Sequence, residues 1–354
     1  MLLIILFLCS MLVTVATLLP LTHISHWTVR GLDFPRLQIL FFAFSIFLIT
    51  ILFLPSHTWS KEFILICCAC CMLYHARWII PYTPFYKKEV PLCKKDNDKT
   101  ISILSSNVLM TNKNYDALLS LINEYNPDII VTLESDITWQ KELSVIENKY
   151  PFTAKCPLDN LYGMHVFSKL ELIDTEIKYL VEKDIPSIHT SIFIHGEKTQ
   201  LHFLHPAPPS PTENETSEER DAELILVAKI IKNVSSPTIV TGDLNDVAWS
   251  TTTRIFRKLS GLCDPRIGRG MFNTFHADYC FIRWPLDHLF HSKHFCLKKM
   301  KRLYLKGSDH FALFTTLALG TINYDHEKEH LSTQERELVN ERLQEQNLEN
   351  KKSL

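Results

Sequence analysis

The hydrophobic positions of this 354-residue chain follow two patterns that meet near residue 83. Before that point they form long uncharged runs, and after it they form short runs separated by polar stretches. Residues 2–19 and 37–54 carry no charged side chain, and each is as long as a helix that crosses a bilayer. A third run, 63–74, crosses only if the apolar residues up to Ile80 complete it. We expect a membrane region over 1–82, with helices at about 2–20, 37–55 and 62–80.

The basic residues of the loops indicate on which side of the membrane the region after the helices lies. The alternative for the first run is a cleaved signal peptide, although that run lacks a basic N-terminal stretch and its apolar core is long. If three helices cross, the first loop and the residues after the third helix share one side and hold most of the basic residues, against Lys61 on the other. This count of basic loop residues slightly favours a cytoplasmic catalytic region. A two-helix or signal-peptide topology changes that answer.

Composition narrows the class of protein. The chain is 46% hydrophobic with a formal net charge of −2, so it lacks the basic excess of a general nucleic-acid binder. Its ten cysteines are widely spaced, five of them in the apolar region. Such spacing is a poor disulfide framework and includes no zinc-finger pairs, so we interpret the cysteines as small apolar residues.

Beyond the membrane region the pattern indicates an α/β domain. Residues 83–100 are polar, basic and proline-containing, which is typical of a linker. Between 101 and 320 the apolar runs predict a mixed-sheet α/β sandwich. Strands are expected near 101–105, 128–133, 162–168, 188–194, 199–204, 237–241, 279–283, 286–291 and 311–317, with helices near 118–125 and 218–232. Residues 321–354 form a charged tail, where Ser332 and Glu335 predict a capped, solvated helix that is an appendage.

Polar side chains interrupt the ends of the predicted strands. Each one alone is more often a turn-former or a helix cap than a site residue. Their number and order make independent turn-formers a poor explanation, because strand ends present side chains to a common cleft. The set is Asn107, Glu134, His205, Asp243 with Asn245, Asp287, and Asp309 with His310.

These residues carry a resemblance to a known family. The stretches SSNV, VTLES, FLHPAPP, VTGDLND, PLDHLF and KGSDHFAL resemble, in order, the motifs of the endonuclease/exonuclease/phosphatase superfamily, over about residues 100–318. Membrane-anchored bacterial members are the most similar in layout. The resemblance implies a DNase I-like four-layer sandwich, two mixed β-sheets flanked by helices, with the site at one end.

The chemistry of phosphoester cleavage suits these residue types. A divalent cation must offset the charge of the phosphate, and Mg²⁺ prefers oxygen ligands. Glu134, with Asn107 and Asp309, is the expected Mg²⁺ site, with Mn²⁺ as a substitute. The resemblance implies that Asp243 is the base for the attacking water. Strand alternation should place Asn245 on the same side, to contact the phosphate.

The histidines are expected to have different roles. His310 should contact the phosphate, with Asp287 orienting its ring and favouring its charged form. By the resemblance, His205 donates to the phosphate or protonates the leaving oxygen. His202 should face the other way, and His165 should be structural.

Substrate and partners stay open at this level. The chain departs from DNA-repair members, since Leu109 stands where an acid is common and Leu133 where a Gln commonly precedes the metal Glu. The membrane anchor makes the lipid bilayer a partner and favours a phospholipid or lipid-linked phosphoester. The alternative is an anchored nuclease, for which the basic stretch Lys298, Lys299, Lys301, Arg302 and Lys306 could follow a polyanion. A silent membrane scaffold and a transporter or receptor are weaker alternatives, because the motifs are intact and the helices lack charges for a pathway.

Overall fold

The computed structural model describes residues 1–55, 58–93, 99–232, 234–320 and 330–346. The chain forms two compact units. The first comprises Met1–Lys87 with the short segments Pro209–Ser217 and Gly268–Gly270, and the second comprises the rest. The domain boundaries expected from the sequence stay predictions, and the two units are described separately.

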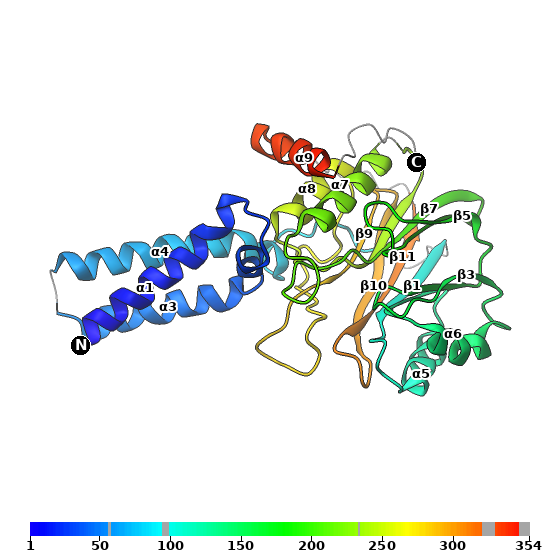
Figure 1. Ribbon diagram of the computed structural model, residues 1–354, viewed down its shortest axis with the longest axis horizontal. Coiled ribbons are helices and arrows are strands. Elements are labelled where there is room, and N and C mark those ends of the chain that lie inside the picture. The colour runs from blue at the N-terminus through cyan, green and yellow to red at the C-terminus, as the bar shows by residue number, and fades with distance from the viewer. Residues whose placement is uncertain (56–57, 94–98, 233, 321–329, 347–354) are drawn as a thin grey trace. The chain divides into compact units, whose positions relative to one another are not determined.

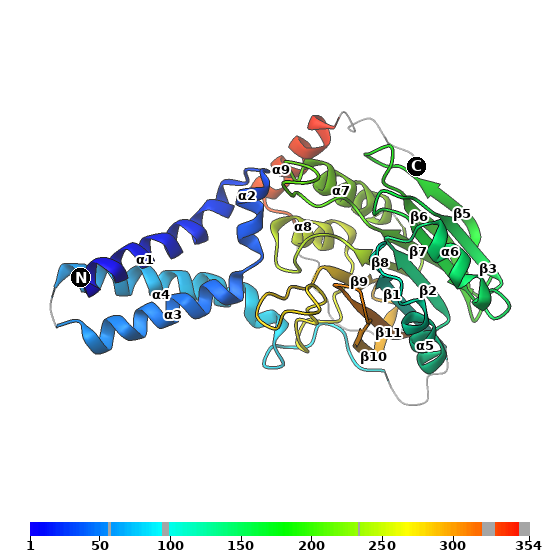
Figure 2. The ribbon, with the colours of Figure 1, turned by 60° about the horizontal axis from the view of Figure 1, so that its bottom comes forward.

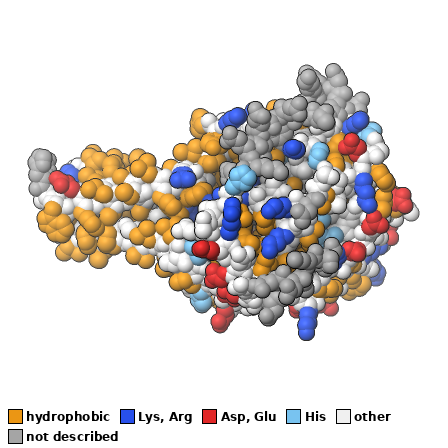
Figure 3. Space-filling model, turned by 90° about the horizontal axis from the view of Figure 1, so that it is seen from above, with side chains coloured by type: hydrophobic (Ala, Val, Ile, Leu, Met, Phe, Trp, Pro, Cys, Tyr) orange, Lys and Arg blue, Asp and Glu red, His pale blue; other side chains and the backbone are white. Residues whose placement is uncertain are grey.

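The first unit is a bundle of three apolar helices, α1 (Leu2–Leu18), α3 (Arg36–Phe53) and α4 (Trp59–Ile79). All three are long and apolar enough to cross a membrane. Small and branched side chains such as Ala43, Ile64 and Cys68 pack between the helices. Exposed apolar side chains, among them Leu8, Leu12, Phe41 and Phe53, lie on the outside of the bundle. Hydrophobic side chains dominate the face of the bundle seen in Figure 3, as expected for a surface that meets lipid.

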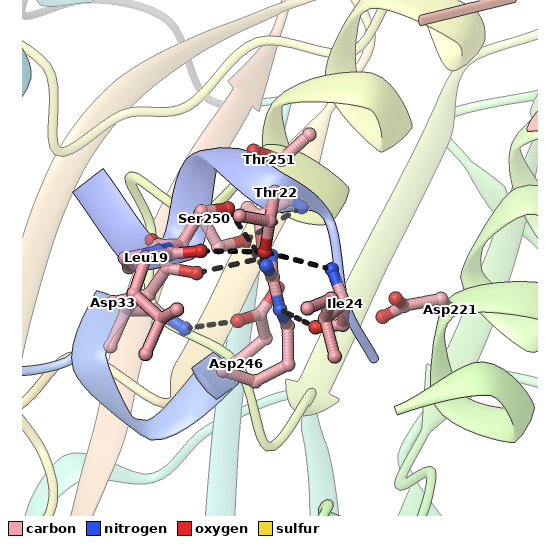
Figure 4. Close-up of polar contacts among 12 residues, drawn as sticks. Leu19, Thr22, Ile24, Asp33, Asp221, Asp246, Ser250 and Thr251 are labelled. Carbon is pink, nitrogen blue, oxygen red and sulfur yellow. Dashed lines mark hydrogen bonds and ion pairs between the residues drawn. The ribbon is translucent and has the colours of Figure 1, made fainter. Parts of the chain in front are cut away.

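The loop between α1 and α3 is folded. It contains the short helices η1 (Leu19–Thr22), α2 (Trp27–Arg30) and η2 (Gly31–Asp33). Thr22 lies beside Leu19 and Ile24, donating through its hydroxyl to the Leu19 carbonyl at 2.7 Å (Figure 4). The Trp27 amide donates to the Glu215 carbonyl at 2.9 Å, and the Ser217 amide donates to the Ser25 carbonyl at 2.9 Å. These bonds place residues 209–217 in the first unit.

The second unit contains two β-sheets. The six-stranded sheet has the order β10-β11-β1-β2-β4-β3, and the five-stranded sheet has the order β5-β6-β7-β8-β9. Its strands are β1 (Thr100–Asn107), β2 (Ile129–Leu133), β3 (Phe152–Cys156), β4 (Met164–Ser168), β10 (Phe295–Tyr304) and β11 (Phe311–Leu319) in the first sheet, and β5 (Ile173–Lys178), β6 (Ser187–Ile194), β7 (Glu197–Leu204), β8 (Thr238–Asp243) and β9 (Asp287–His291) in the second.

The two sheets are mixed and pack face to face. β1 pairs parallel with β2, and β7 pairs parallel with β8, whereas the other pairs are antiparallel (Figure 1). Branched residues on the inner faces, among them Ile103, Val131, Phe203 and Ile239, form the central core. Alternating side chains point away from this core, as the period of two in a strand dictates.

Helices complete the four layers (Figure 2). α5 (Tyr115–Tyr125) and α6 (Ile137–Leu143) cover the outer face of the six-stranded sheet, where they share a core with Leu104 and Phe314. α7 (Glu218–Lys232) and α8 (Thr251–Ser260) cover the outer face of the other sheet around Val240 and Phe290. The α/β sandwich expected from the sequence is confirmed.

Some predicted elements were wrong or missed. Residues 279–283 form an irregular loop with bends instead of a strand, and Phe281 there is 88% exposed, so their apolar character did not report burial. The apolar pattern of the sequence did not predict β3, β5, β10, α6 or α8. β5 is largely exposed, and four of the ten residues of β10 are Lys or Arg, so neither strand shows the long apolar run that signals a strand.

The C-terminal helix was only partly predicted. α9 (Thr333–Glu345) begins with the expected capping box of Ser332 and Glu335. It is not a solvated appendage, because Val339 and Leu343 are buried against the α7 and α8 core. Two apolar residues four apart suffice to anchor one helix face, and that signal was hidden by the charged residues around it.

The interpretation of all ten cysteines as small apolar residues is also wrong. Cys93 forms a disulfide with Cys296 of β10, across a sequence separation of 203 residues. The chain before Cys93 runs beside this strand, and the Cys93 amide donates to the Leu297 carbonyl at 3.1 Å. Spacing along the chain could not reveal the pair, since the fold alone brings the two residues together.

Candidate active site

The strand-end residues meet where the two sheets present the ends of β1, β2 and β8. Asn107 ends β1, and Glu134 directly follows β2, its parallel neighbour. The Asn107 side-chain amide donates to Glu134 Oε1 at 2.7 Å and to Asp243 Oδ2 at 3.2 Å. Because Asp243 ends β8 in the other sheet, Asn107 links the two sheets at the site.

His310 is held between two buried carboxylates. Its Nδ1 lies 2.8 Å from Asp287 Oδ2, and its Nε2 lies 3.5 Å from Asp243 Oδ2. Asp243 and Asp287 face each other as partners of the β8–β9 pair. Burial alone would lower the pKa of His310, but the Asp287 and Asp243 carboxylates outweigh burial and raise that pKa to about 10. His310 is therefore an imidazolium at neutral pH, hydrogen-bonded to Asp287.

Asn245 reaches the site by a turn, which corrects the argument from strand alternation. β8 ends at Asp243, and Asn245 has a left-handed backbone with φ of 49°. Its amide donates to Asp243 Oδ1 at 3.0 Å, and its side chain donates to the Pro206 carbonyl at 3.0 Å. An Asx turn, and not the pleat of a strand, brings the two side chains together.

His205 lies beside Asp243 in a different state from His310. Its Nε2 is 3.9 Å from Asp243 Oδ2, and the Tyr162 ring lies against it at 5.2 Å. Burial lowers the pKa of His205 to about 4, against the attraction of Asp243. The imidazole is neutral at pH 7 and can donate from one nitrogen. Its Nδ1 is buried with no hydrogen-bond partner among the described residues.

Glu134 and Asp309 leave acceptor atoms free for a cation. Burial raises the pKa of Glu134 to about 7 against the hydrogen bond from Asn107, and the charges of Asp309 and Asp243 add to the rise. Asp309 is thus close enough to Glu134 to act on it electrostatically. Within the described chain, Asp309 Oδ1 and Asp287 Oδ1 are buried without a hydrogen-bond partner. Clustered carboxylates with unused oxygens are a donor set that fits Mg²⁺.

Two groups of side chains compete as the metal site. The ligand atoms of Asp243, Asp287 and His310 lie within 4.8 Å of one another, close enough to share one ion. However, the positive charge on His310 opposes a bound cation, and its Nδ1 is occupied by Asp287. Glu134 with Asp309, oriented by Asn107, fits a hard cation better because it offers oxygen atoms only.

Several neighbouring residues support the site without having been predicted. The Ser308 hydroxyl donates to the Asn107 carbonyl at 2.8 Å and accepts from the His310 amide at 3.0 Å, so it joins two of the motifs. The Phe275 ring lies against His310 at 4.9 Å. Ser308 stands inside the quoted GSDH stretch and could have been found, whereas Phe275 lies in a loop with no motif.

The two histidines set aside in the sequence analysis lie apart from this cluster. His202 turns toward β6, where its Nδ1 meets His189 Nδ1 at 2.7 Å. His165 is buried on β4 beside Thr132 Oγ1 at 3.4 Å. All eight predicted site residues, by contrast, belong to one connected group at one end of the sandwich. Their individual roles stay predictions.

Comparison with known proteins decides the family. The family model described as "Endonuclease/Exonuclease/phosphatase family" matches residues 104–310, which include every predicted site residue. The chain belongs to this family. No curated protein matches the chain in sequence.

Solved structures confirm the DNase I-like fold of this family member. D. rerio TDP2, solved with a single-strand DNA product, has a TM-score of 0.52 at 18% identity, over 62% of this chain and 99% of that one. The human Nocturnin catalytic domain has a TM-score of 0.50 at 18% identity, over 62% and 95%. An endonuclease/exonuclease/phosphatase from Bacteroides vulgatus has a TM-score of 0.50 at 15% identity, over 62% and 99%. At these identities the likeness establishes the fold alone.

Proposed function

We propose that the protein is a divalent-metal-dependent phosphoesterase tethered to a membrane. The observation that carries the proposal is the excess of buried acid at one point: Glu134, Asp243, Asp287 and Asp309 surround one imidazolium. Buried charges in proteins are usually paired or bind metals, so such an excess of acid favours a bound cation. Most superfamily members hydrolyse phosphoesters, and this donor set suits that chemistry.

The roles of the side chains follow from their positions and charge states. Glu134 and Asp309 would hold a divalent cation, which supplies Lewis acidity to a phosphoryl oxygen when bound. Asp243 accepts the proton of the attacking water, since it is buried and ionised beside two histidines. His310, kept positive by Asp287, donates to the charge that grows on the phosphoryl oxygens. Neutral His205 donates to the phosphate or the leaving oxygen, and Asn245 positions the phosphate.

A membrane-confined phosphoester is the preferred substrate class. Three helices long and apolar enough to cross a membrane would hold the second unit near lipid head groups. The near-neutral net charge of −2 also disfavours tracking of a long nucleic acid. The alternative is an anchored nuclease, a class to which the DNA-product complex of D. rerio TDP2 draws attention.

We further propose that the second unit lies outside the cytoplasm. The count of basic residues favours the cytoplasm, but the Cys93–Cys296 disulfide favours an oxidising compartment. A disulfide is retained only where thiols are not continuously reduced, whereas the basic count is a statistical preference. Alkaline phosphatase fused after Leu319 should therefore be active in intact cells, and a fluorescent cytoplasmic reporter at that position should be dark. The opposite pattern would return the unit to the cytoplasm.

The activity is tested on the purified full-length protein with MgCl₂. The panel contains bis(4-nitrophenyl) phosphate, single- and double-stranded DNA, RNA and phospholipid vesicles. Hydrolysis of the aryl diester and of phospholipid supports the proposal, and selective cleavage of nucleic acid supports the alternative. Loss in Glu134→Gln and Asp243→Asn, but not in the exposed Asp174→Asn control, would locate the reaction at this site. Equal activity in all three variants would show that the site is elsewhere.

A further inference from the structure

Two arginines lie together beside the proposed catalytic residues. Arg302 is on β10 and Arg283 is in the loop that precedes β9. Both guanidinium groups stack on the ring of Phe311, at 4.3 Å for Arg302 and 4.9 Å for Arg283. Phe311 directly follows His310 in the chain. The loop that carries Arg283 also contacts His310 through Phe275, at 4.9 Å between ring centroids, so the arginine pair lies near the candidate active site.

The loop that carries Arg283 is attached to the same residues. The Arg283 side chain donates to the His276 carbonyl at 3.1 Å and to the Ala277 carbonyl at 2.7 Å. The Ala277 amide donates to the Asp309 carbonyl at 2.6 Å. Arg302 Nη1 donates to the Asn273 carbonyl. The loop therefore fixes both arginines relative to Asp309, one of the expected metal ligands.

Neither arginine has an acidic partner in the described chain. Their contacts are with backbone carbonyls and with the Phe311 ring, and no carboxylate forms an ion pair with either. Burial lowers the pKa of Arg302, and the like charge of Arg283 lowers it further. The two guanidinium groups share one ring and their like charges repel, so an anion that binds both would relieve this repulsion.

Donors remain available for such an anion. Arg283 uses Nε and Nη2, which leaves Nη1, and Arg302 uses Nη1, which leaves Nε and Nη2. These three nitrogens make no hydrogen bond among the described residues and are not among the buried polar atoms, so they are accessible to solvent. Two lysines of the basic stretch that contains Arg302 lie on the opposite side of the strand. Lys299 and Lys301 lie over Tyr125 of α5, on the outer face of the sheet.

We propose that Arg283 and Arg302 form a subsite for a second anionic group of the substrate, a phosphate other than the one that is cleaved. The inference rests on the proposed phosphoesterase function and refines its substrate class. Planar guanidinium groups bind phosphate oxygens in a bidentate manner, and the backbone carbonyls and the shared Phe311 ring orient them for this. A substrate with two phosphate groups would bridge the metal site and this arginine pair. Such a substrate could be a nucleotide or a phosphorylated lipid headgroup, since both present the same chemistry.

Calorimetric titration of the full-length protein tests the proposal with two matched ligand pairs. The nucleotide pair is thymidine 3′,5′-bisphosphate and thymidine 5′-monophosphate, and the headgroup pair is inositol 1,4-bisphosphate and inositol 1-phosphate. The wild-type protein should bind one bisphosphate about tenfold or more tightly than its monophosphate, as expected for a charged hydrogen-bonded contact. The pair that shows the preference identifies the source of the second phosphate.

The variants separate the subsite from general charge. Arg283→Gln and Arg302→Gln should each remove most of the preference, while Lys301→Gln, which removes one positive charge from the same strand, should retain it. Arg302→Lys keeps the positive charge but loses the planar guanidinium group, so this variant should retain only part of the preference for the bisphosphate. Equal binding of both members in both pairs, or a preference that survives both glutamine variants, would overturn the subsite. Absence of wild-type hydrolysis on every substrate of the panel, including bis(4-nitrophenyl) phosphate, which has no second anion, would instead refute the phosphoesterase.

Discussion

Two buried polar clusters lie near each other in the second unit, and only one of them is complete. Asp264 and Arg266 are fully buried and pair at 2.8 Å, and Arg266 also contacts His288 Nδ1 at 2.6 Å. The other cluster is the candidate active site around His310. In the first cluster one acid meets one base, whereas in the second the acids outnumber the bases.

The histidines of the two clusters show the consequence. Burial and the charge of Arg266 lower the pKa of His288 to about 3, so this ring is neutral. Its Nδ1 accepts a hydrogen bond from Arg266, and its Nε2 donates one to the Asp246 carbonyl. For His310, two carboxylates reverse the effect of burial and raise the pKa to about 10. A cluster that is balanced by its own residues stabilises the fold, and one that lacks positive charge is suited to bind a cation and an anionic substrate.

The largest expected effect is on turnover at the incomplete cluster. Glu134→Gln and Asp243→Asn should each lower hydrolysis about 10³-fold, because one removes a metal ligand and the other the general base. The melting temperature should stay the same or rise, since removing an acid relieves repulsion among like charges. Initial rates and thermal melts check both statements. A large drop in melting temperature would make this cluster structural, like that of Asp264.

The converse substitution should act on stability. Asp264→Asn removes the carboxylate that pairs with the buried Arg266 guanidinium, which costs about 3–5 kcal/mol. A cost of that size lowers the melting temperature by roughly 6–20 °C for a domain of this kind. Thermal melting measures the change, and the exposed Asp174→Asn variant is the control. A melting temperature within about 2 °C of the wild-type value would show that the Asp264–Arg266 pair does not stabilise the fold, contrary to its proposed structural role.

Metal binding should raise stability only through the incomplete cluster. At a concentration about a hundred times its dissociation constant, a cation adds about 2.7 kcal/mol, or roughly 5–10 °C in melting temperature. EDTA should remove both this increment and the activity, and excess MgCl₂ should restore them. In Glu134→Gln the melting temperature should no longer respond to MgCl₂. An unchanged response in that variant would place the metal on other ligands.

The smallest effect concerns a buried acid outside both clusters. Burial raises the pKa of Glu223 on α7 to about 8, and the charge of Glu182 adds to the rise. Because the folded-state pKa lies above the unfolded value, the contribution of this group is complete below about pH 4.5 and declines as the pH rises to about 8. Glu223→Gln should therefore raise the melting temperature by a few degrees at pH 8 and by less at pH 5. An equal shift at both values would contradict the raised pKa.

Local patterns in the sequence predicted much of the fold. Uncharged runs long enough to span a bilayer predicted α1, α3 and α4, and the α7 stripe gave a helix with the observed bounds Glu218–Lys232. The exposed strand β5 was missed because few of its residues are apolar, and α6 was missed because seven residues are too few to show a helical period. The apolar residues of 279–283 predicted a strand, although this segment is exposed and packs against no core. Hydrophobic periodicity reports an element only when that element faces a core.

The sequence by itself determined the identities and order of the site residues, because motif spacing is a local property of the chain. Only the tertiary structure decided their states: that His310 is charged while His205 and His288 are neutral, and that Asn245 reaches the site through a turn. It also decided the Cys93–Cys296 disulfide and the pairing of Arg283 with Arg302 around one ring. Charge state and contact depend on groups distant in sequence that fall within a few ångströms in space, and no pattern along the chain contains those distances.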